Sequence, residues 1–493
     1  MESIRHKIHT IPPQVKASFW ALFCGVLQKG IGVITTPIFT RLLSTAEYGQ
    51  YNVFNSWIQI FTVIFSLNLC AGVYQQGLVK FDEDNRAYTS SMQGLTTVLM
   101  IIWGGILFIF RNKLTGLLSL NTRQIVMIPL IIWSASIFGF WLAEQRNFYK
   151  YKALVFVTLT VSVLSPALAI LLIKISDDKV TARILGGLII GLIAYVPLYC
   201  LHIKRGKKFF SAKYWRYALI FNIPLVPHYL SQVVLNSSDR IMIEKMVDKS
   251  AAGIYGLAYS ISLIMTILNN ALSQTLSPWI YQKIKARETE RISSVAYISM
   301  IGVSAVNLIL IALAPEAVKI FAPAEYYDAI WIIPPVAISV YYMFIYDMFA
   351  KFAFYYEKRI FITVASVAAA ALNIILNYIF INKYGYIAAG YTTLICYIVY
   401  SLGHYIFMKR VCKKFCDGVQ PYDGKIILLI SFAFTACGLA MLLTYNHTVI
   451  RYCILAAIII IAVLLRKKIL EFIKNILIMR KSHDSGKAEI DER

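Results

Sequence analysis

One lysine lies where a charged side chain is costly. Lys29 follows Gln28 near the middle of an apolar run over residues 17–40. A charged residue at the centre of a membrane-spanning helix costs roughly 2.5–3.5 kcal/mol on insertion scales. We therefore expect Lys29, with Gln28 beside it, to face a water-filled cavity and to attract an anionic ligand. The other interpretation is that the helix begins later and that Lys29 reaches the interface along its aliphatic stem.

Two arginines lie near the ends of apolar runs. Arg41 follows the first run, and Arg240 follows Asp239 at the end of the seventh. The guanidinium fork makes two parallel hydrogen bonds to phosphate oxygens, which suits a pyrophosphate, and Asp239 is placed to hold Arg240. A charge at the membrane interface or a structural salt bridge is an equally open interpretation.

A polar stripe follows two prolines in the seventh run. His228, Gln232 and Asn236 are spaced four apart, so they share one helix face, which we expect to line a cavity. Pro224 and Pro227 interrupt backbone hydrogen bonds and let the helix bend. His228 is a candidate for carrying a coupling proton, although a lone histidine is more often a packed polar residue.

Two further pairs have helical spacing. Asp347 and Lys351 are four apart near the inner end of the tenth run, where a structural ion pair is favoured over a role in ion coupling or gating. Asn373 and Asn377 are also four apart, and we expect them to join helices or to line a path.

Composition shows which elements must position these residues. The 493 residues are 59% hydrophobic and only 15% charged, whereas a soluble protein has about a quarter charged residues. Since a bilayer core needs about 20 apolar residues per helix, we predict an all-α integral membrane protein with about fourteen transmembrane helices. The predicted spans are residues 17–40, 50–72, 91–110, 124–143, 153–173, 184–203, 217–238, 251–276, 295–315, 329–350, 361–381, 386–407, 426–445 and 450–466.

Basic residues predict the orientation. With both termini in the cytoplasm, the inner segments hold 34 of the 48 Lys and Arg residues and the outer segments hold 13. The net charge of +23 is then explained by a cytoplasmic face beside anionic headgroups, so we expect no nucleic-acid partner. The segment from Lys467 to Lys481 is basic and amphipathic, which is typical of a helix lying on the inner leaflet.

The loops leave little room for enzymatic chemistry. No gap between spans is long enough for a nucleotide-binding domain, and the sequence has no phosphate loop, HExxH or GxSxG motif. Cys412 and Cys416 are four apart without nearby histidines, so we expect free thiols and no metal site. No catalytic residue and no cofactor are predicted, and helices joined by short loops are typical of a secondary transporter.

An internal repeat divides the chain. Gly49 and Tyr51 recur as Gly253 and Tyr255 at a constant offset of 204, each after a basic residue, two apolar residues and a polar turn. We interpret this as two six-helix lobes related by a parallel pseudo-two-fold axis, although a recurrent turn would also explain it. The predicted divisions are an N-terminal lobe at 1–213, a C-terminal lobe at 214–410, helices 13 and 14 at 411–466 and a basic cytoplasmic tail at 467–493.

Four stretches carry a resemblance to a known family. They are FTRLLSTAEYGQY at 39–51, PLVPH at 224–228 followed by SDRIMI at 238–243, AGIYGLAY at 252–259, and LNIILNYIFI at 372–381 followed by YGYIAAG at 384–390. The ordered set resembles polysaccharide-precursor flippases of the Wzx type, within the multidrug/oligosaccharidyl-lipid/polysaccharide exporter superfamily. The resemblance implies alternating access, a cationic cavity and transfer of a polyprenyl-pyrophosphate-linked oligosaccharide to the outer leaflet.

Three functions therefore compete. The favoured one is a flippase of the bacterial inner membrane that serves O-antigen or capsule biosynthesis, with lipid-linked oligosaccharide, membrane lipids and other polysaccharide-assembly proteins as partners, and we expect a monomer. A cation-coupled multidrug exporter of the same fold is second, because it would usually need buried acids where this chain has Lys29. A membrane polysaccharide polymerase or acyltransferase ranks last, because the outer gaps are short.

Overall fold

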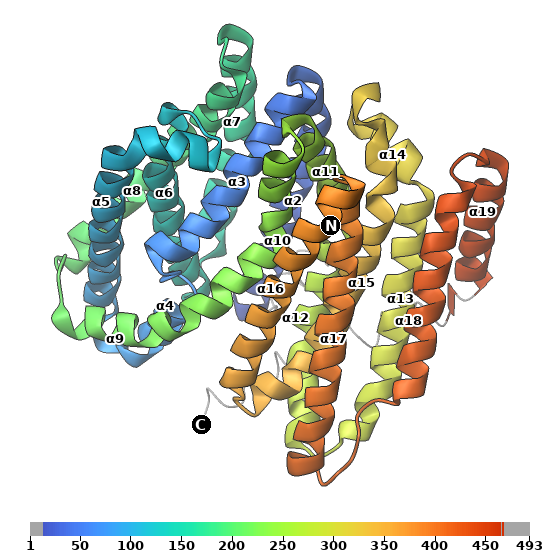
Figure 1. Ribbon diagram of the computed structural model, residues 1–493. Helices are drawn as coiled ribbons and strands as arrows, with labels where there is room; N and C mark the ends of the chain where they lie inside the picture. The colour runs from blue at the N-terminus through green and yellow to red at the C-terminus, as the bar shows by residue number, and fades with distance from the viewer. Residues whose placement is uncertain (1–12, 465, 468–493) are drawn as a thin grey trace, which may run out of the picture. The chain divides into compact units, whose positions relative to one another are not determined.

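The computed structural model describes residues 13–464, 466 and 467, and these residues form helices joined by short turns (Figure 1). No strand occurs in this part of the chain, which confirms the predicted all-α class. The predicted interfacial helix after Lys467 and most of the basic tail lie outside the described residues.

The chain divides into two compact units, residues 1–244 and 245–493. The division between residues 244 and 245 falls inside the helix Val226–Met246, which contains most of the predicted seventh span. The predicted domain boundaries at 213, 410 and 466 stay a prediction.

Unit 1 contains long helices joined by turns and two short helical breaks. They are α2 (Pro13–Leu42), α3 (Thr45–Ser66), α4 (Val73–Lys80), η1 (Asp82–Asp84), α5 (Asn85–Leu118), α6 (Thr122–Asn147), α7 (Tyr151–Ile175), α8 (Lys179–Gly206), α9 (Ala212–Asn222), η2 (Ile223–Leu225) and α10 (Val226–Met246), whose last two residues belong to the second unit.

Unit 2 contains the remaining helices. They are α11 (Lys249–Ser262), α12 (Met265–Lys285), η3 (Thr289–Arg291), α13 (Ile292–Ala312), α14 (Ala314–Phe321), η4 (Ala324–Trp331), α15 (Ile333–Tyr355), α16 (Arg359–Tyr384), α17 (Ala388–Phe415), α18 (Gly424–Ala440), η5 (Met441–Thr444) and α19 (Thr448–Leu464). Its most deeply buried span is α15, in which 83% of the residues of the most apolar stretch are buried inside the protein.

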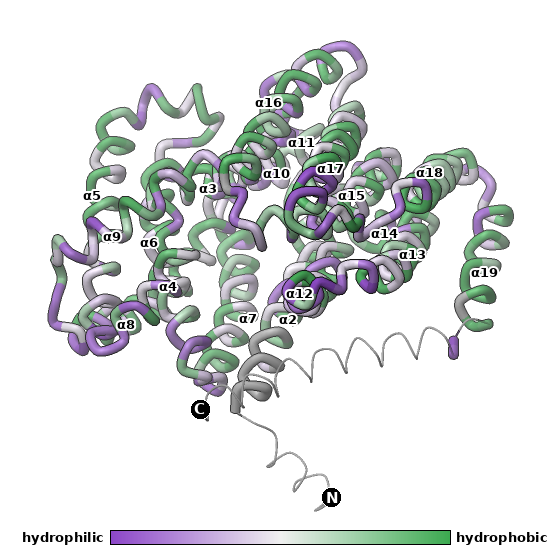
Figure 2. Tube along the Cα trace, turned by 90° about the horizontal axis from the view of Figure 1, so that it is seen from below, coloured by the Kyte–Doolittle hydropathy of each residue, from purple (hydrophilic) through white to green (hydrophobic). Residues whose placement is uncertain are grey.

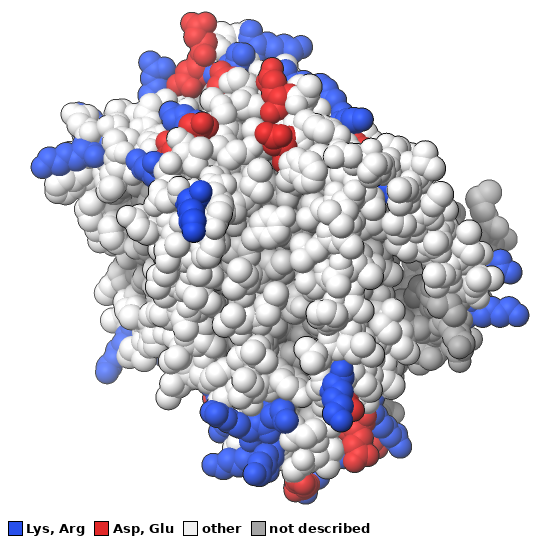
Figure 3. All heavy atoms as spheres, turned by 45° about the vertical axis from the view of Figure 1, so that its right-hand side comes forward, with Lys and Arg blue, Asp and Glu red and all other residues white. Residues whose placement is uncertain are grey.

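Ten of the described helical segments are long and apolar enough to cross a membrane. Hydrophobic residues run along most of the helices, and hydrophilic residues concentrate at turns and helix ends (Figure 2). On the face drawn in Figure 3, most of the surface is made of uncharged residues, and Lys, Arg, Asp and Glu occur in small groups. The chain is therefore a multi-pass membrane protein, while the total of fourteen spans stays a prediction.

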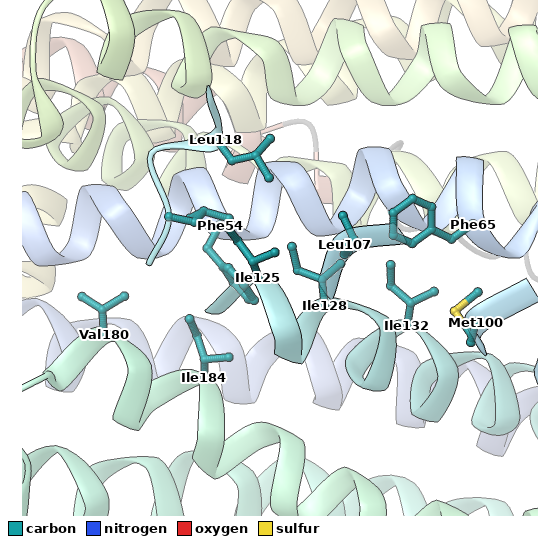
Figure 4. Close-up of a cluster of buried hydrophobic side chains, with 11 residues drawn as sticks. Phe54, Phe65, Met100, Leu107, Leu118, Ile125, Ile128, Ile132, Val180 and Ile184 are labelled. Atoms are coloured by element: carbon teal, nitrogen blue, oxygen red, sulfur yellow. The ribbon is translucent and has the colours of Figure 1, made fainter. Parts of the chain in front are cut away.

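The core of unit 1 forms where α3, α5, α6 and α8 meet. Ile125, Ile128 and Ile132 recur at helical spacing on α6 and are fully buried, and Figure 4 shows them among side chains of the other three helices. Phe65 of α3 stacks on Trp103 of α5 with 4.6 Å between the ring centroids. Apolar packing of this kind fixes the helices that carry the polar groups described below.

The repeated sequence motif forms the same capped turn twice. The Ser44 side chain accepts a hydrogen bond from the backbone N–H of Glu47 at 3.2 Å and starts α3. The Asp248 side chain accepts one from the backbone N–H of Ala251 at 2.7 Å and starts α11. Ser and Asp suit this position because their short side chains satisfy helix N–H groups that lack a partner within the helix. Both turns join long helices at corresponding places in the sequence.

Candidate functional site

A cavity opens between α3 and α10, and all of its lining residues belong to unit 1. Its volume is about 330 Å³, at the lower end of the range of about 300–1,000 Å³ that is typical of ligand pockets. None of its lining side chains is charged: they are Gln59, Thr62, Val63, Asn68, Tyr229, Gln232 and Val233. The cavity therefore presents amides, one hydroxyl and one phenol against two valines.

The α3 side of the cavity depends on how this helix ends. Gln59 and Thr62 are three apart and share a helix face. The helix stops at Leu67, which has a left-handed φ of 50°, and Asn68 follows with a φ of 52°. Asn222 supports this turn by donating its amide N–H to the carbonyl of Leu67 at 2.7 Å. Asparagine tolerates the left-handed region, so Asn68 lines the cavity from the turn itself.

The α10 side begins at the predicted proline break. The helix α9 ends at Asn222, a single 3₁₀ turn contains Pro224, and α10 starts at Val226, which confirms that the prolines interrupt the seventh span. Tyr229 and Gln232 then lie three apart and face the cavity. The break matters because it sets where the polar face of α10 starts.

Hydrogen bonds inside the wall determine what the lining groups can offer a ligand. Ser237 donates its hydroxyl to the side-chain oxygen of Gln59 at 3.3 Å, so the Gln59 amide nitrogen remains to donate to a ligand. Thr62 donates its hydroxyl to the carbonyl of Ile58 at 2.7 Å and keeps only acceptor capacity. Fixed neutral donors and acceptors beside a tyrosine ring suit hydroxyl groups and ring faces of a sugar better than a bare charge.

The predicted stripe on α10 lies only partly in this cavity. Gln232 lines it, whereas Asn236 donates its side-chain amide to the carbonyl of Gln232 at 2.7 Å. Arg240 donates to the carbonyl of Asn236 at 2.7 Å, one turn further on. His228 is partly buried and is not a lining residue, and Asp239 is completely buried. The predicted roles of these residues stay predictions.

The predicted cationic residues on α2 lie elsewhere on unit 1. Gln28, Lys29 and Arg41 are exposed on this helix, and none of them lines the cavity between α3 and α10. Arg41 donates to the carbonyl of Pro37 at 2.9 Å. A separate cationic contact for a charged ligand therefore stays a prediction.

The predicted ion pair forms in unit 2. Lys351 donates to the Asp347 carboxylate at 2.6 Å, and the Ser273 hydroxyl joins both side chains at 2.7 Å from Asp347 and 3.1 Å from Lys351. Lys351 is buried, while 34% of the Asp347 side chain is exposed. The structural pairing predicted from the spacing is therefore present, and a role in ion coupling or gating stays a prediction.

The asparagine pair joins two helices of unit 2. Asn373 and Asn377 are completely buried on α16, and the amide of Asn377 donates to Asn373 at 3.2 Å. The Asn373 amide reaches Thr393 of α17 at 3.5 Å, and Thr392 donates to Asn377. These contacts support the expectation that the pair holds helices together.

Sequence reasoning missed several residues of unit 1. Gln59 and Asn68 are polar positions inside the predicted second span, and that signal alone could have marked them. Glu144 and His202 were missed because they lie at span ends, where polar side chains usually face water; here they contact each other at 2.8 Å.

Comparisons with known proteins give the family. The model of the family described as "Polysaccharide biosynthesis protein" matches residues 15–284, which include every residue of the cavity. The Haemophilus influenzae "Lsg locus putative protein 1" is 22% identical over 367 residues, covering 70% of this chain and 86% of the relative.

Two solved structures share the fold. The lipid II flippase MurJ in an inward closed conformation superposes with a TM-score of 0.68 at 16% identity, over 92% of this chain and 99% of MurJ. An inward-facing multidrug resistance MATE family transporter of the MOP superfamily superposes with a TM-score of 0.57 at 13% identity, over 79% of this chain and 95% of the transporter. The chain therefore belongs to the polysaccharide biosynthesis protein family and has the fold of the multidrug/oligosaccharidyl-lipid/polysaccharide exporter superfamily.

Proposed function

We propose that this membrane protein is a flippase that moves a polyprenyl-pyrophosphate-linked oligosaccharide from the cytoplasmic to the outer leaflet by alternating access. It would serve O-antigen or capsule biosynthesis in the bacterial inner membrane, with both termini in the cytoplasm. The observation that carries the proposal is the uncharged cavity between α3 and α10, whose lining includes three side-chain amides, in a chain of the polysaccharide biosynthesis family.

The physical need for such a cavity is simple. Each sugar hydroxyl that leaves water without a hydrogen-bond partner costs several kcal/mol in an apolar medium, so an oligosaccharide needs a polar path across the bilayer. Gln59, Asn68 and Gln232 carry amides that both donate and accept, and Tyr229 offers a ring face. A volume of about 330 Å³ holds part of an oligosaccharide head group, while the prenyl tail stays in lipid.

The charged part of the substrate needs a different contact. Because the cavity lining is uncharged, we assign the pyrophosphate to the predicted cationic residues Lys29, Arg41 and Arg240. His228, Asp239 and the Asp347–Lys351 pair remain the proposed positions for ion coupling or gating. In this assignment the amides of the cavity select the sugar, and the cationic side chains hold the pyrophosphate.

A cation-coupled multidrug exporter is the second candidate, supported by the likeness to the MATE fold. An organic cation would favour an acidic cavity, whereas the lining between α3 and α10 has no Asp or Glu. A precursor such as the lipid II of MurJ shares the pyrophosphate and sugar chemistry, so it belongs to the favoured class.

Binding to the purified protein in nanodiscs tests the proposal. Three ligands are compared: a polyprenyl-pyrophosphate oligosaccharide, the same carrier without sugar, and ethidium. We expect the oligosaccharide carrier to bind at least tenfold more tightly than the bare carrier, and ethidium not to compete. Equal affinity for both carriers would contradict a sugar-binding cavity, and displacement by ethidium would favour the drug exporter.

A further inference from the structure

Three helices of unit 1 meet at a buried histidine that the proposed function does not use. His202 of α8 is 3% exposed, and its Nε2 lies 2.8 Å from the carboxylate of Glu144 on α6. Its Nδ1 lies 3.0 Å from the side-chain amide nitrogen of Gln93 on α5, which is completely buried. Both ring nitrogens therefore have a partner, and each partner comes from a different helix.

The partners determine which nitrogen carries the proton. An amide nitrogen can only donate, so Nδ1 of His202 accepts from Gln93, and Nε2 carries the proton that is donated to Glu144. In this arrangement the imidazole is neutral. The amide oxygen of Gln93 is buried and makes no hydrogen bond among the described residues.

Glu144 and Gln93 can also accept hydrogen bonds from both N–H groups of the charged His202 imidazole. When a proton from water binds Nδ1, both ring nitrogens donate. A half-turn of the Gln93 amide then presents its oxygen to Nδ1–H, while Nε2–H continues to face Glu144. Histidine is the side chain that commonly changes charge between about pH 5 and 8, and the buried carboxylate supplies the opposite charge.

The partly exposed carboxylate of Glu144 gives the proton a route to His202. The Glu144 side chain is 16% exposed, whereas that of His202 is 2% exposed, so access is through the carboxylate. Besides His202 itself, the charged groups that act on Glu144 are Arg205 of α8 and Lys150 of the turn after α6. The phenol of Tyr74 on α4 is also nearby, and it is bound to Thr89 at 2.8 Å.

We propose that Glu144, His202 and Gln93 form a proton-binding site that is separate from the cavity between α3 and α10. Binding of one proton converts a neutral imidazole beside a carboxylate into a buried ion pair that joins α6 and α8. By the predicted orientation these helix ends face the cytoplasm. The site would therefore couple cytoplasmic pH to the packing of α5, α6 and α8, and so to the rate of transport.

Two pH profiles of the full-length protein test the site. One is the thermal unfolding temperature in detergent, which needs no substrate, and the other is flipping in proteoliposomes, both between about pH 5 and 8. The variants are His202→Gln, which removes the proton acceptor, and Glu144→Gln, which keeps the shape but removes the counter-charge. His447→Gln is the matched control, because His447 is exposed in the turn before α19.

We expect His202→Gln to abolish a sigmoidal step in both profiles, and Glu144→Gln to move its midpoint down by about one pH unit or more, a tenfold loss of proton affinity. His447→Gln should keep the wild-type step. If Glu144→Gln and His202→Gln lower the unfolding temperature equally at every pH, the contact is only structural and the proposal fails. If His202→Gln does not fold, an unchanged midpoint in Glu144→Gln would still overturn it. The pH profile of the unfolding temperature tests the proton site independently of the proposed function, because it needs no flipping.

Discussion

The sharpest prediction concerns the order in which polar groups of the cavity contribute to sugar binding. Gln59→Leu removes an amide whose oxygen is held by Ser237 at 3.3 Å and whose nitrogen can donate to a ligand. Ser237→Ala keeps the Gln59 amide but removes the hydrogen bond that orients it. Thr62→Val removes a hydroxyl that already donates to its own helix at 2.7 Å. We expect the loss of affinity for the oligosaccharide carrier to be largest for Gln59→Leu, smaller for Ser237→Ala and smallest for Thr62→Val.

The magnitudes follow from hydrogen-bond energetics. Gln59 is exposed, so loss of its hydrogen bond to a sugar hydroxyl should cost about 0.5–1.5 kcal/mol, and because 1.4 kcal/mol is a factor of ten, Gln59→Leu should weaken binding about 2- to 12-fold. Loss of orientation alone costs about 0.5–1 kcal/mol, or about 2- to 5-fold for Ser237→Ala. Thr62→Val should change affinity by less than about 2-fold, because its donor is already used.

The assay compares dissociation constants for the oligosaccharide carrier and the sugar-free carrier in nanodiscs. Gln59→Leu and Ser237→Ala should lose affinity for the first ligand and keep their affinity for the second, whereas Thr62→Val should bind both ligands nearly as wild type. Ser293→Ala makes the same chemical change as Ser237→Ala, but its hydroxyl bonds to Glu290 at the start of α13, so it should bind as wild type. Equal losses on both carriers, or a Thr62→Val loss as large as that of Gln59→Leu, would refute the reasoning.

Three further predictions concern packing and reactivity. Gly186→Ala should destabilise the protein by about 1–3 kcal/mol, because the new Cβ would lie 2.6 Å from the α7 backbone, whereas Gly187→Ala meets nothing within 4 Å and should be neutral in thermal unfolding. Glu316→Gln should cost about 3–5 kcal/mol, because it leaves the Arg451 guanidinium, whose side chain is 3% exposed, buried without its counter-charge, and a cost below about 1 kcal/mol would contradict this. A hydrogen bond from the Cys412 thiol lowers the pKa of the Cys416 thiol to about 6, so alkylation of Cys416 should fall as pH drops through about 6, and Cys412→Ala should move that midpoint up. Mass spectrometry of the Cys416 peptide measures it.

Local patterns in the sequence predicted what a single helix can encode. The spacing of Gln232 and Asn236 placed them on one face of α10, and their side-chain contacts follow that face. The spacing of Asp347 and Lys351 predicted a pair that forms at 2.6 Å. Such relations depend only on helix geometry, which the chain fixes within one or two turns.

Relations between distant helices were not accessible in the same way. Gln59 and Gln232 share a cavity although they are far apart in the sequence, and no periodicity states which faces of α3 and α10 meet. Asn68 joins them only because the backbone turns left-handed at the end of α3. Glu144 and His202 lie at the ends of their spans, where sequence reasoning assigns polar residues to water.

The decisive experiment for the proposed flippase is leaflet-resolved flipping by the purified protein in proteoliposomes. A labelled polyprenyl-pyrophosphate oligosaccharide is followed in vesicles with wild type, Lys29→Ala or Lys29→Arg at matched reconstitution. We expect flipping by wild type, loss with Lys29→Ala and recovery with Lys29→Arg, because the cavity supplies sugar contacts and a separate cation holds the pyrophosphate. No flipping by wild type, together with efflux of cationic dyes, would contradict it.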